Sequence, residues 1–283
     1  MLINKDFIDI ISQISKKITL PSIKTVFIPS NNPETGKHSK KSNFGAIELE
    51  EGTIGVFFVS LSPEMKNIAM KTDFTQLNGT NPITLANKFG SSDIFEKTLG
   101  FGAINAISQY IFKESNFCFD FTTDSLGLLD LNRSDTPGMV GFFPPLVSYI
   151  EKLGLPLIII EKKANLVQKT NDWEVTLDPT RLKTCNKILI TSTTVLNETL
   201  DEILRFCSQA EKISIIGPTA GFLPDPLFSR GVNIVGGTYI HDPNLFMELI
   251  SKNKRWGPST KKYCIQKNNY PGISYLLNTI KNR

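Results

Sequence analysis

The chain has 283 residues, enough for two domains or one large one, and its apolar share of 40% and charged share of 20% are ordinary for a globular protein. The formal net charge is +4, and the densest basic segment is 252–262. Because no basic stripe with interleaved aromatic side chains accompanies this segment, we interpret it as a solvated surface and expect no nucleic-acid partner.

The four cysteines, Cys118, Cys185, Cys207 and Cys264, lie far apart and form no CxxC motif. This spacing excludes a zinc ribbon and a thioredoxin-like redox site. The first residues, MLINKDFIDII, lack the regions of a signal peptide, and no apolar run reaches membrane-spanning length. We therefore expect a reduced cytoplasmic protein without a membrane partner.

The first part of the chain mixes helix and strand patterns. Residues 6–17 place apolar side chains at helical spacing, and residues 23–29 are a strand candidate. A polar loop at 31–42 precedes the segment 44–61, in which two apolar runs flank EEGT as in a β-hairpin. This order predicts a separate α+β domain.

Two helices are predicted next, at 82–88 and 93–112. Asp93 suits the N-terminal cap of the second helix, and Glu96 lies in its first turn, where the helix dipole favours an acid. The helix contains LGFGAINAISQ, whose small residues indicate close contact of its backbone with another helix or with a ligand. We expect Asn105, on this small-residue surface, to face a cleft between domains.

From residue 138 onward, short apolar runs alternate with helical patterns. Ile, Leu and Val runs bounded by Gly, Pro, Thr and Asn suit strands buried on both faces, and their alternation with helices predicts a mostly parallel sheet. The predicted strands are 138–143, 157–161, 188–191, 213–217 and 233–240, and a final short helix is predicted at 273–280. We predict an α/β fold with a small domain at 1–115, a connection at 116–136 and a Rossmann-like domain at 137–283.

Polar or conformationally special residues follow each of these strands. Ligands of such sheets bind beyond the carboxyl ends of the strands, so these residues share one expected ligand edge. They are the turn FFPP at 142–145, Glu161, the group Thr191, Thr193, Thr194 and Asn197, the loop Gly217, Pro218 and Thr219, and the pair His241 and Asp242.

Glu161 lies where dinucleotide-binding folds place the acid that accepts hydrogen bonds from ribose hydroxyls. The turn before it lacks the GxGxxG motif, since Gly138 and Gly141 fall within the predicted strand. Pro144 and Pro145 also remove backbone donors that a pyrophosphate needs. Classical NAD binding is therefore disfavoured, and two interpretations of Glu161 stay open: a structural or ion-paired residue, and a ligand contact.

The segment TSTTVLNET at 191–199 concentrates hydroxyl and amide side chains. Thr199 and Glu202 fit a capping box at the start of the next helix. The groups upstream, beside the free N–H groups of a helix N-terminus, suit a carboxylate, phosphate or other anion. The loop GPTAG at 217–221 lets a ligand approach the backbone, but it lacks the GK[ST] of a P-loop.

The chain has two histidines, His38 and His241. His241 is the best candidate for proton transfer because it lies at the ligand edge, and Glu161 is the second catalytic candidate. Asp242 followed by Pro243 fits a helix N-cap and is interpreted as structural. No HExxH, GxSxG or His/Cys cluster is present, so we assign no metal ligands: a metal would bind side chains distant in sequence or arrive with a small chelator.

Several separated motifs resemble those of a known family. GMVGFFPPL, the strand ending in Glu161, LITSTTVLNETLDEIL, IGPTAGFLPDPLFSRGV and LGFGAINAISQ are similar to motifs of the putative heavy-metal chelation family. The resemblance implies an enolase N-terminal-like domain, a Rossmann-like domain and a cleft between them. Its implied pocket residues are Asn105, Gly141, Glu161, Thr193, Thr194, Asn197, Gly217 and Pro218. A link to metal chelators, or to a heterocyclic small molecule, is suggested for the family.

Three functions are consistent with the sequence. In the first, the chain binds, and in one version transforms, a polar or anionic small molecule in the cleft, such as a metal-chelating metabolite. In the second, it is a non-catalytic carrier or sensor of a metal–chelate complex. In the third, it is a nucleotide- or S-adenosylmethionine-dependent enzyme, which the proline-rich turn argues against. The sequence identifies no cofactor. Apolar residues expected at the surface, such as Phe222 and Phe228, are compatible with a homodimer.

Overall fold

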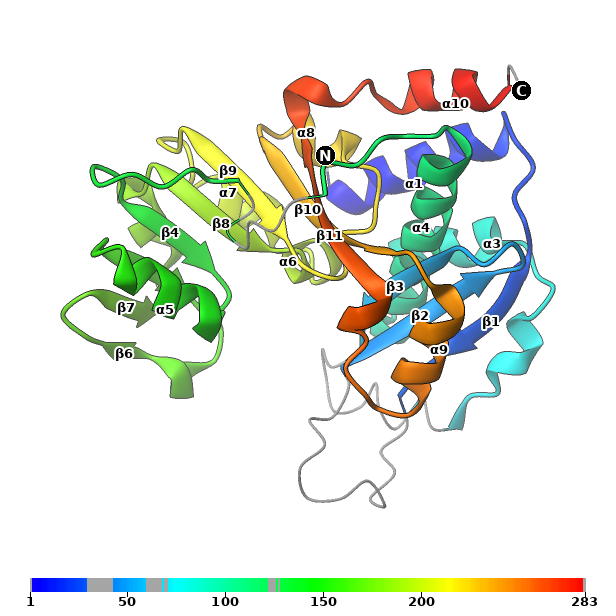
Figure 1. Ribbon diagram of the computed structural model, residues 1–283, viewed down its shortest axis with the longest axis horizontal. Helices are drawn as coiled ribbons and strands as arrows, with labels where there is room; N and C mark the ends of the chain where they lie inside the picture. The colour runs from blue at the N-terminus through cyan, green and yellow to red at the C-terminus, as the bar shows by residue number, and fades with distance from the viewer. Residues whose placement is uncertain are drawn as a thin grey trace.

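The computed structural model describes residues 2–29, 43–59, 68, 71–121, 126 and 128–281. The predicted loop at 31–42, with His38, and the last part of the predicted hairpin lie outside these residues. Two sheets organise the chain: a small antiparallel one and a large, mostly parallel one. In Figure 1 the small sheet lies at the right, strands β4 to β7 of the large sheet lie at the left, and β10 and β11 run between them.

The small sheet follows helix α1 (Ile3–Ser15) and has the order β1-β2-β3. Strand β1 (Ile23–Phe27) pairs with β2 (Phe44–Leu49), which forms the predicted hairpin with β3 (Ile54–Phe58). The hairpin turn uses Gly52 at a φ of +90°, a conformation that glycine adopts without strain. The α+β pattern predicted for this part is confirmed.

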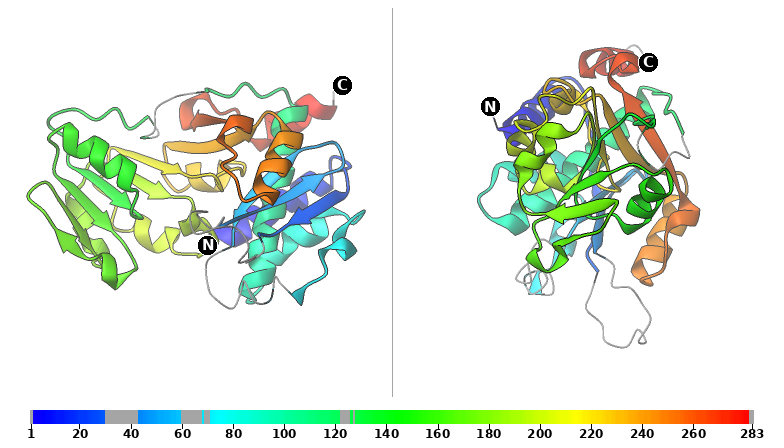
Figure 2. Two further views of the ribbon diagram at one scale, coloured as in Figure 1. Left: turned by 60° about the horizontal axis from the view of Figure 1, so that its bottom comes forward. Right: turned by 90° about the vertical axis from the view of Figure 1, so that its left-hand side faces the viewer.

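Two helices enclose the small sheet. Helix α4 (Ile94–Glu114), which follows the short α3 (Pro82–Ala86), packs on β3, and Asp93 caps it as predicted by accepting a hydrogen bond from the Glu96 N–H. Helix α9 (Pro243–Ser251), from the C-terminal part, covers the opposite face through Phe246 and Ile250 (Figure 2). Coverage on both faces explains why nearly all of β2 is buried.

The glycines and alanines of α4 let its backbone approach β3 closely. A Cβ atom added to Gly55 of β3 would lie 2.2 Å from the Ala106 nitrogen and 2.4 Å from the Gly102 oxygen of α4. The predicted close backbone contact of this helix is therefore real, and its partners are strand β3 and the 3-10 helix η2 (Asn87–Gly90), where a Cβ atom at Gly100 would lie 2.3 Å from the Phe89 nitrogen.

Within the described residues, the large sheet has eight strands in the order β11-β10-β9-β8-β4-β5-β7-β6. Neighbours from β10 to β7 pair in parallel, whereas β11 and β6 pair antiparallel at the edges. In chain order the parallel strands run 3-2-1-4-5-6 across the sheet, which is the order of the doubly wound dinucleotide-binding fold. The strands are β4 (Pro137–Val140), β5 (Leu157–Ile160), β6 (Gln168–Lys169), β7 (Trp173–Thr176), β8 (Lys187–Thr191), β9 (Lys212–Ile216), β10 (Ile234–Ile240) and β11 (Thr260–Gln266).

Strands β6, β7 and β11 were not predicted from the sequence. Both residues of β6 are exposed, and β11 begins with the exposed Lys261 and Lys262, so neither strand shows the apolar run of a buried strand. Helix α5 (Pro144–Lys152) links β4 to β5, and the path from β5 to β8 passes through β6, β7 and the 3-10 helical turns η3 (Ala164–Leu166) and η4 (Pro179–Thr184).

One hydrophobic cluster runs through both parts of the molecule. It joins α1 and α4 to the segment after β9, where the rings of Phe7 and Phe222 lie 5.2 Å apart. Helix α10 (Ile273–Lys281), predicted at 273–280, packs on α4 at the same core. Phe222 and Phe228 are buried in this core, so the surface position expected for them was wrong and they give no support to a dimer.

None of the helices in the described residues is both long and apolar enough to cross a membrane.

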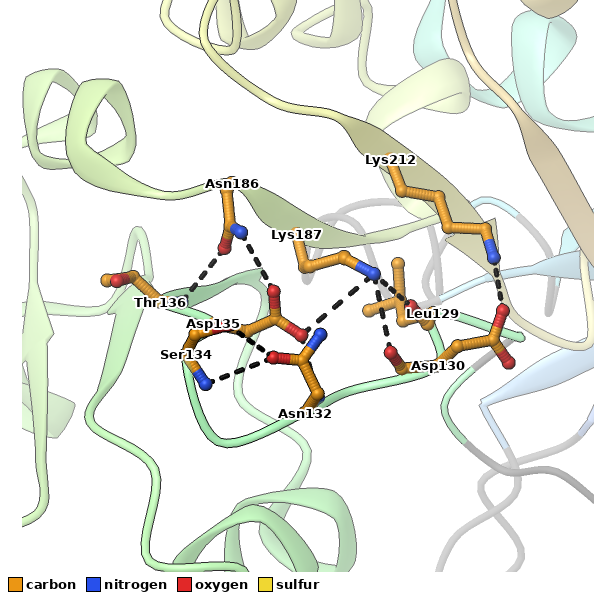
Figure 3. Close-up of polar contacts among 9 residues, drawn as sticks. All are labelled: Leu129, Asp130, Asn132, Ser134, Asp135, Thr136, Asn186, Lys187 and Lys212. Carbon is orange, nitrogen blue, oxygen red and sulfur yellow. Dashed lines mark hydrogen bonds and ion pairs between the residues drawn. The ribbon is translucent and has the colours of Figure 1, made fainter.

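A polar network ties together the edge of the large sheet at which β4, β8 and β9 begin (Figure 3). Buried Asp135 accepts hydrogen bonds from the Asn132 N–H at 2.7 Å and from Asn186 Nδ2 at 2.8 Å, and its carboxylate lies 3.9 Å from Lys187 Nζ. Lys187 Nζ also donates to the Leu129 oxygen at 3.0 Å. These contacts anchor the connection at 128–136 against the start of β8.

We expect Asp135→Asn to lower stability by about 1–2 kcal/mol at pH 7, because charge-assisted hydrogen bonds are lost. Burial raises the pKa of Asp135, but the hydrogen bonds from Asn132 and Asn186 and the charge of Lys187 together hold that pKa below its ordinary value. A depressed folded-state pKa contributes stability above the unfolded value, about 3.9, and that contribution disappears as the pH falls through the folded pKa. Urea unfolding at pH 7 and pH 3 should show the variant's deficit shrinking at pH 3.

Asp172→Asn is the control, since Asp172 is exposed, and it should change stability little at either pH. An Asp135→Asn deficit that is equal at pH 7 and pH 3 would contradict this role of the carboxylate.

Candidate functional site

A cavity of about 990 Å³ lies beyond the carboxyl ends of β4, β8 and β9, and residues of β2, β3 and α4 form part of its wall. In the strand order of the sheet, β4 and β8 flank the point at which the chain changes direction, where doubly wound folds bind their ligands. The cavity wall includes Gly141, Glu161, Thr191, Thr193, Thr194, Asn197, Gly217, Pro218 and Thr219, all of which belong to the predicted site.

The turn after β4 begins at Gly141, which has a φ of +91°. The strand ends at Val140, so the placement of Gly141 within the strand was wrong. A Cβ atom at Gly141 would lie 3.1 Å from Thr191 Cγ2, which leaves little room for a larger residue between the two strand ends. The turn continues through Phe142 and Phe143, which line the cavity.

Glu161 holds this turn in place. Its Oε2 accepts a hydrogen bond from the Phe142 N–H at 3.1 Å, and its Oε1 accepts from the Lys162 N–H at 2.7 Å. The carboxylate therefore connects the ends of β4 and β5, and Glu161 is part of the cavity wall. A role as ligand contact or catalytic residue stays a prediction.

Hydroxyl groups crowd the end of β8. Thr191 Oγ1 and Thr193 Oγ1 lie 3.0 Å apart, and Thr194 Oγ1 donates to the Thr191 oxygen at 2.8 Å. The helix that follows is broken into α6 (Thr193–Leu196) and α7 (Leu200–Leu204). Because α6 has only four residues, the helix dipole invoked for anion binding is weak here.

The predicted capping box of Thr199 and Glu202 does not form. Thr199 stands at the cap position of α7, but its side chain makes no cap hydrogen bond. Its Oγ1 donates instead to Asn197 Oδ1 at 2.6 Å, and this bond shapes the break between the two helices.

The loop after β9 completes this side of the cavity. Ser192 Oγ and Thr219 Oγ1 lie 2.8 Å apart and are buried. Gly217 has a φ of +150°, and a Cβ atom there would lie 2.3 Å from Ser192 Oγ. Glycine is thus required at this position to keep the two loops in contact.

Side chains of helix α4 hold the same loop in place through hydrogen bonds. Asn105 Nδ2 donates to the Thr219 oxygen at 3.0 Å and to the Val56 oxygen at 2.7 Å, and Gln109 Nε2 donates to the Gly221 oxygen at 2.8 Å. The Tyr263 hydroxyl donates to the Ala220 oxygen at 3.1 Å. Asn105 is fully buried and lies outside the cavity wall, so it positions the loop rather than lining the cavity. Its Oδ1 has no hydrogen-bond partner.

Sequence reasoning missed Gln109 and Tyr263. Gln109 follows Asn105 by four residues, so the two amides share one helix face, and this spacing was the available signal. No local pattern marks Tyr263, which reaches the loop because β11 pairs with β10.

The opposite wall comes from the N-terminal part and was also missed. It includes the rings of Phe44 and Phe58, which lie 5.7 Å apart, and the side chain of Lys97. The Lys97 side chain is only 11% exposed, and its Nζ pairs with the carboxylate of Glu198 at the α6–α7 break. The cavity therefore lies between the two parts of the chain, as expected for the cleft.

Comparison with known proteins places this architecture in a family. Residues 124–268 match the model of DUF364, described as putative heavy-metal chelation. An uncharacterized protein of Methanocaldococcus jannaschii is 30% identical over 189 residues, which cover 64% of this chain and 70% of that protein. The chain belongs to the DUF364 family.

Two solved structures of DUF364 proteins of unknown function have the same fold. The protein from Pyrococcus horikoshii is 20% identical with a TM-score of 0.62, and the one from Desulfitobacterium hafniense DCB-2 is 17% identical with a TM-score of 0.65. Each alignment covers 93% of this chain and 98% of the solved chain, so the likeness includes both sheets.

His241, the predicted proton-transfer residue, is exposed after the end of β10 and does not line the cavity of this DUF364 protein. Its N–H donates to the Ser259 oxygen at 3.1 Å. Asp242 caps α9 as predicted, by accepting a hydrogen bond from the Leu245 N–H at 3.0 Å. The predicted threonines and glycines thus line the cavity, whereas the predicted histidine does not.

The side chains of the cavity do not fit a directly coordinated heavy metal. Among the described residues, no group of three or more His, Cys, Asp or Glu side chains could hold a metal ion. No cysteine in the described part of the chain lines the cavity, and burial elsewhere raises the pKa of Cys185 to about 11 and that of Cys207 to about 12, so neither is a thiolate at neutral pH.

Proposed function

We propose that this DUF364 protein binds a polar small molecule, such as a heterocyclic or metal-chelating metabolite, in the cavity between its two sheets. The observation that carries the proposal is the position of the cavity: the ends of the parallel strands β4, β5, β8 and β9 at the switch point form one wall, and the N-terminal part forms the other. A volume of about 990 Å³ suits a metabolite-sized ligand.

The chemistry of the wall supports a ligand that is both flat and polar. Phe44 and Phe58 on one side, with Phe142 and Phe143 on the other, offer aromatic surface to a ring. Thr191 and Thr193 offer hydroxyl groups that both donate and accept hydrogen bonds.

A non-catalytic carrier or sensor is the second candidate, and the positions of the two predicted catalytic residues favour it. The Glu161 carboxylate is engaged by backbone N–H groups, and His241 lies outside the cavity wall. A dinucleotide is less well supported, because Pro144 and Pro145 occupy the first turn of α5 and the Phe142 N–H is bound by Glu161.

The test is native mass spectrometry with elemental analysis on protein purified without added metal. We expect a copurified organic molecule, with any metal present only in proportion to it. Thr193→Val removes one cavity hydroxyl at constant volume, and we expect it to weaken binding about 2- to 10-fold, as loss of one hydrogen bond does.

Thr279→Val on α10 is the matched control and should retain the ligand, since Thr279 lies outside the cavity wall. A ligand-free protein that no fraction of a metabolite extract stabilises against heat would reject the proposal. A product released on incubation would favour an enzyme over a carrier.

A further inference from the structure

Lys97 is unusual among the cations that line the cavity. Lys162 and Lys163 are exposed, whereas the Lys97 side chain is 11% exposed. A nearly buried ammonium needs a counter-charge, and the ion pair that the structure gives Lys97 is with Glu198.

Glu198, which supplies the counter-charge, has an unfavourable backbone conformation. Its φ is +58°, in the left-handed region that asparagine and glycine adopt more readily than glutamate. Its carboxylate bridges two helices of the N-terminal part: Oε1 accepts from Asn4 Nδ2 at 2.8 Å, and Oε2 accepts from Lys97. Both Glu198 and Lys97 line the cavity.

We propose that Lys97 is the carboxylate-binding residue of the cavity, and that Glu198 occupies this subsite until a carboxylate ligand displaces it. Displacement breaks only the Lys97 contact, because Asn4 retains the other oxygen of Glu198. This inference rests on the proposed function in one respect, that the ligand binds in the cavity. It adds that the ligand carries a carboxylate and that Glu198 competes with this carboxylate for Lys97.

The decisive variant is Glu198→Asn, because asparagine tolerates the positive φ while the negative charge is lost. Citrate is the probe, titrated by calorimetry at constant ionic strength because salt screens charge interactions. We expect Glu198→Asn to bind citrate at least about tenfold more tightly than wild type, which corresponds to ~1.4 kcal/mol. Adding Lys97→Met should abolish that gain.

Glu96→Gln is the matched control, since Glu96 lies on α4 beside Lys97 and pairs with exposed Lys88, and the variant should bind citrate as wild type does. Citrate affinity in Glu198→Asn that equals or falls below the wild-type value would overturn the proposal. A gain in citrate affinity that persists when Lys97→Met is added to Glu198→Asn would overturn it as well.

A second measurement needs no variant and therefore does not depend on how Glu198→Asn folds. Acetic anhydride labels accessible lysines, and peptide mass spectrometry reports each rate. We expect citrate to slow acetylation of Lys97 severalfold and to leave exposed Lys88 unchanged; equal rates with and without citrate would refute the subsite. If native mass spectrometry finds a neutral ligand or no ligand, that result tests the proposed function. The carboxylate subsite at Lys97 is tested separately, by the citrate experiments.

Discussion

Gly55→Ala is expected to destabilise the protein by about 3 kcal/mol or more, the upper end of what overpacking a core costs. The added methyl group would lie 2.2 Å from the Ala106 nitrogen and 2.4 Å from the Gly102 oxygen. Both neighbours are backbone atoms of α4, so no side chain can rotate away and the whole helix has to shift. Urea unfolding followed by circular dichroism measures the loss.

Gly257→Ala is the matched control, because a Cβ atom there would meet nothing within 4 Å. It should change the free energy of unfolding by less than about 0.5 kcal/mol. A folded Gly55→Ala variant that loses less than about 1 kcal/mol would mean that α4 can move off the small sheet at little cost. Such mobility would also separate Asn105 and Gln109 from the cavity loop.

Arg230→Met is expected to cost about 3 kcal/mol, since it leaves two partly buried carboxylates without their cation. The Arg230 side chain is 14% exposed and pairs with Asp6 of α1 and Asp201 of α7. Asp201 also accepts a hydrogen bond from the Ile3 N–H at 3.2 Å, so this group holds the start of α1 against the C-terminal part. Thermal and urea unfolding measure the effect.

The triple variant R230M/D6N/D201N should recover most of that loss, because no charge is left unpaired. Lys252→Met, which breaks an exposed pair with Glu248, is the control and should stay within about 0.5 kcal/mol of wild type. If R230M and the triple variant are equally unstable, packing of the long arginine side chain is what matters and the electrostatic argument is wrong.

The sequence located much of the cavity wall because the relevant signals are local. Each buried strand is an apolar run, and parallel strands bring their carboxyl ends to one edge, so Thr191, Thr193 and Gly217 could be grouped before their contacts were known. The caps at Asp93 and Asp242 were predictable for the same reason, since each depends on a few neighbouring residues.

Local signals failed where a residue has two possible partners. Thr199 fits a capping box with Glu202, but it binds Asn197, which also lies within a few residues of it in the chain. His241 follows a strand at the ligand edge, but β10 lies two strands away from β8, and the histidine is exposed outside the cavity wall. The position of His241 in the sequence predicted the correct edge of the sheet, but it did not predict how far along that edge the residue lies from the cavity.

By itself, the sequence determined the α/β class, the buried parallel strands and the polar groups that end them, because apolar periodicity and turn chemistry act over a few residues. Only the tertiary structure decided which surface faces those groups. Phe58 and Lys97 reach the cavity because α4 packs on β3 and the N-terminal part shares its core with the segment after β9. Such packing depends on the fit between surfaces whose residues lie far apart in the chain, so it cannot be predicted from any short segment of the sequence.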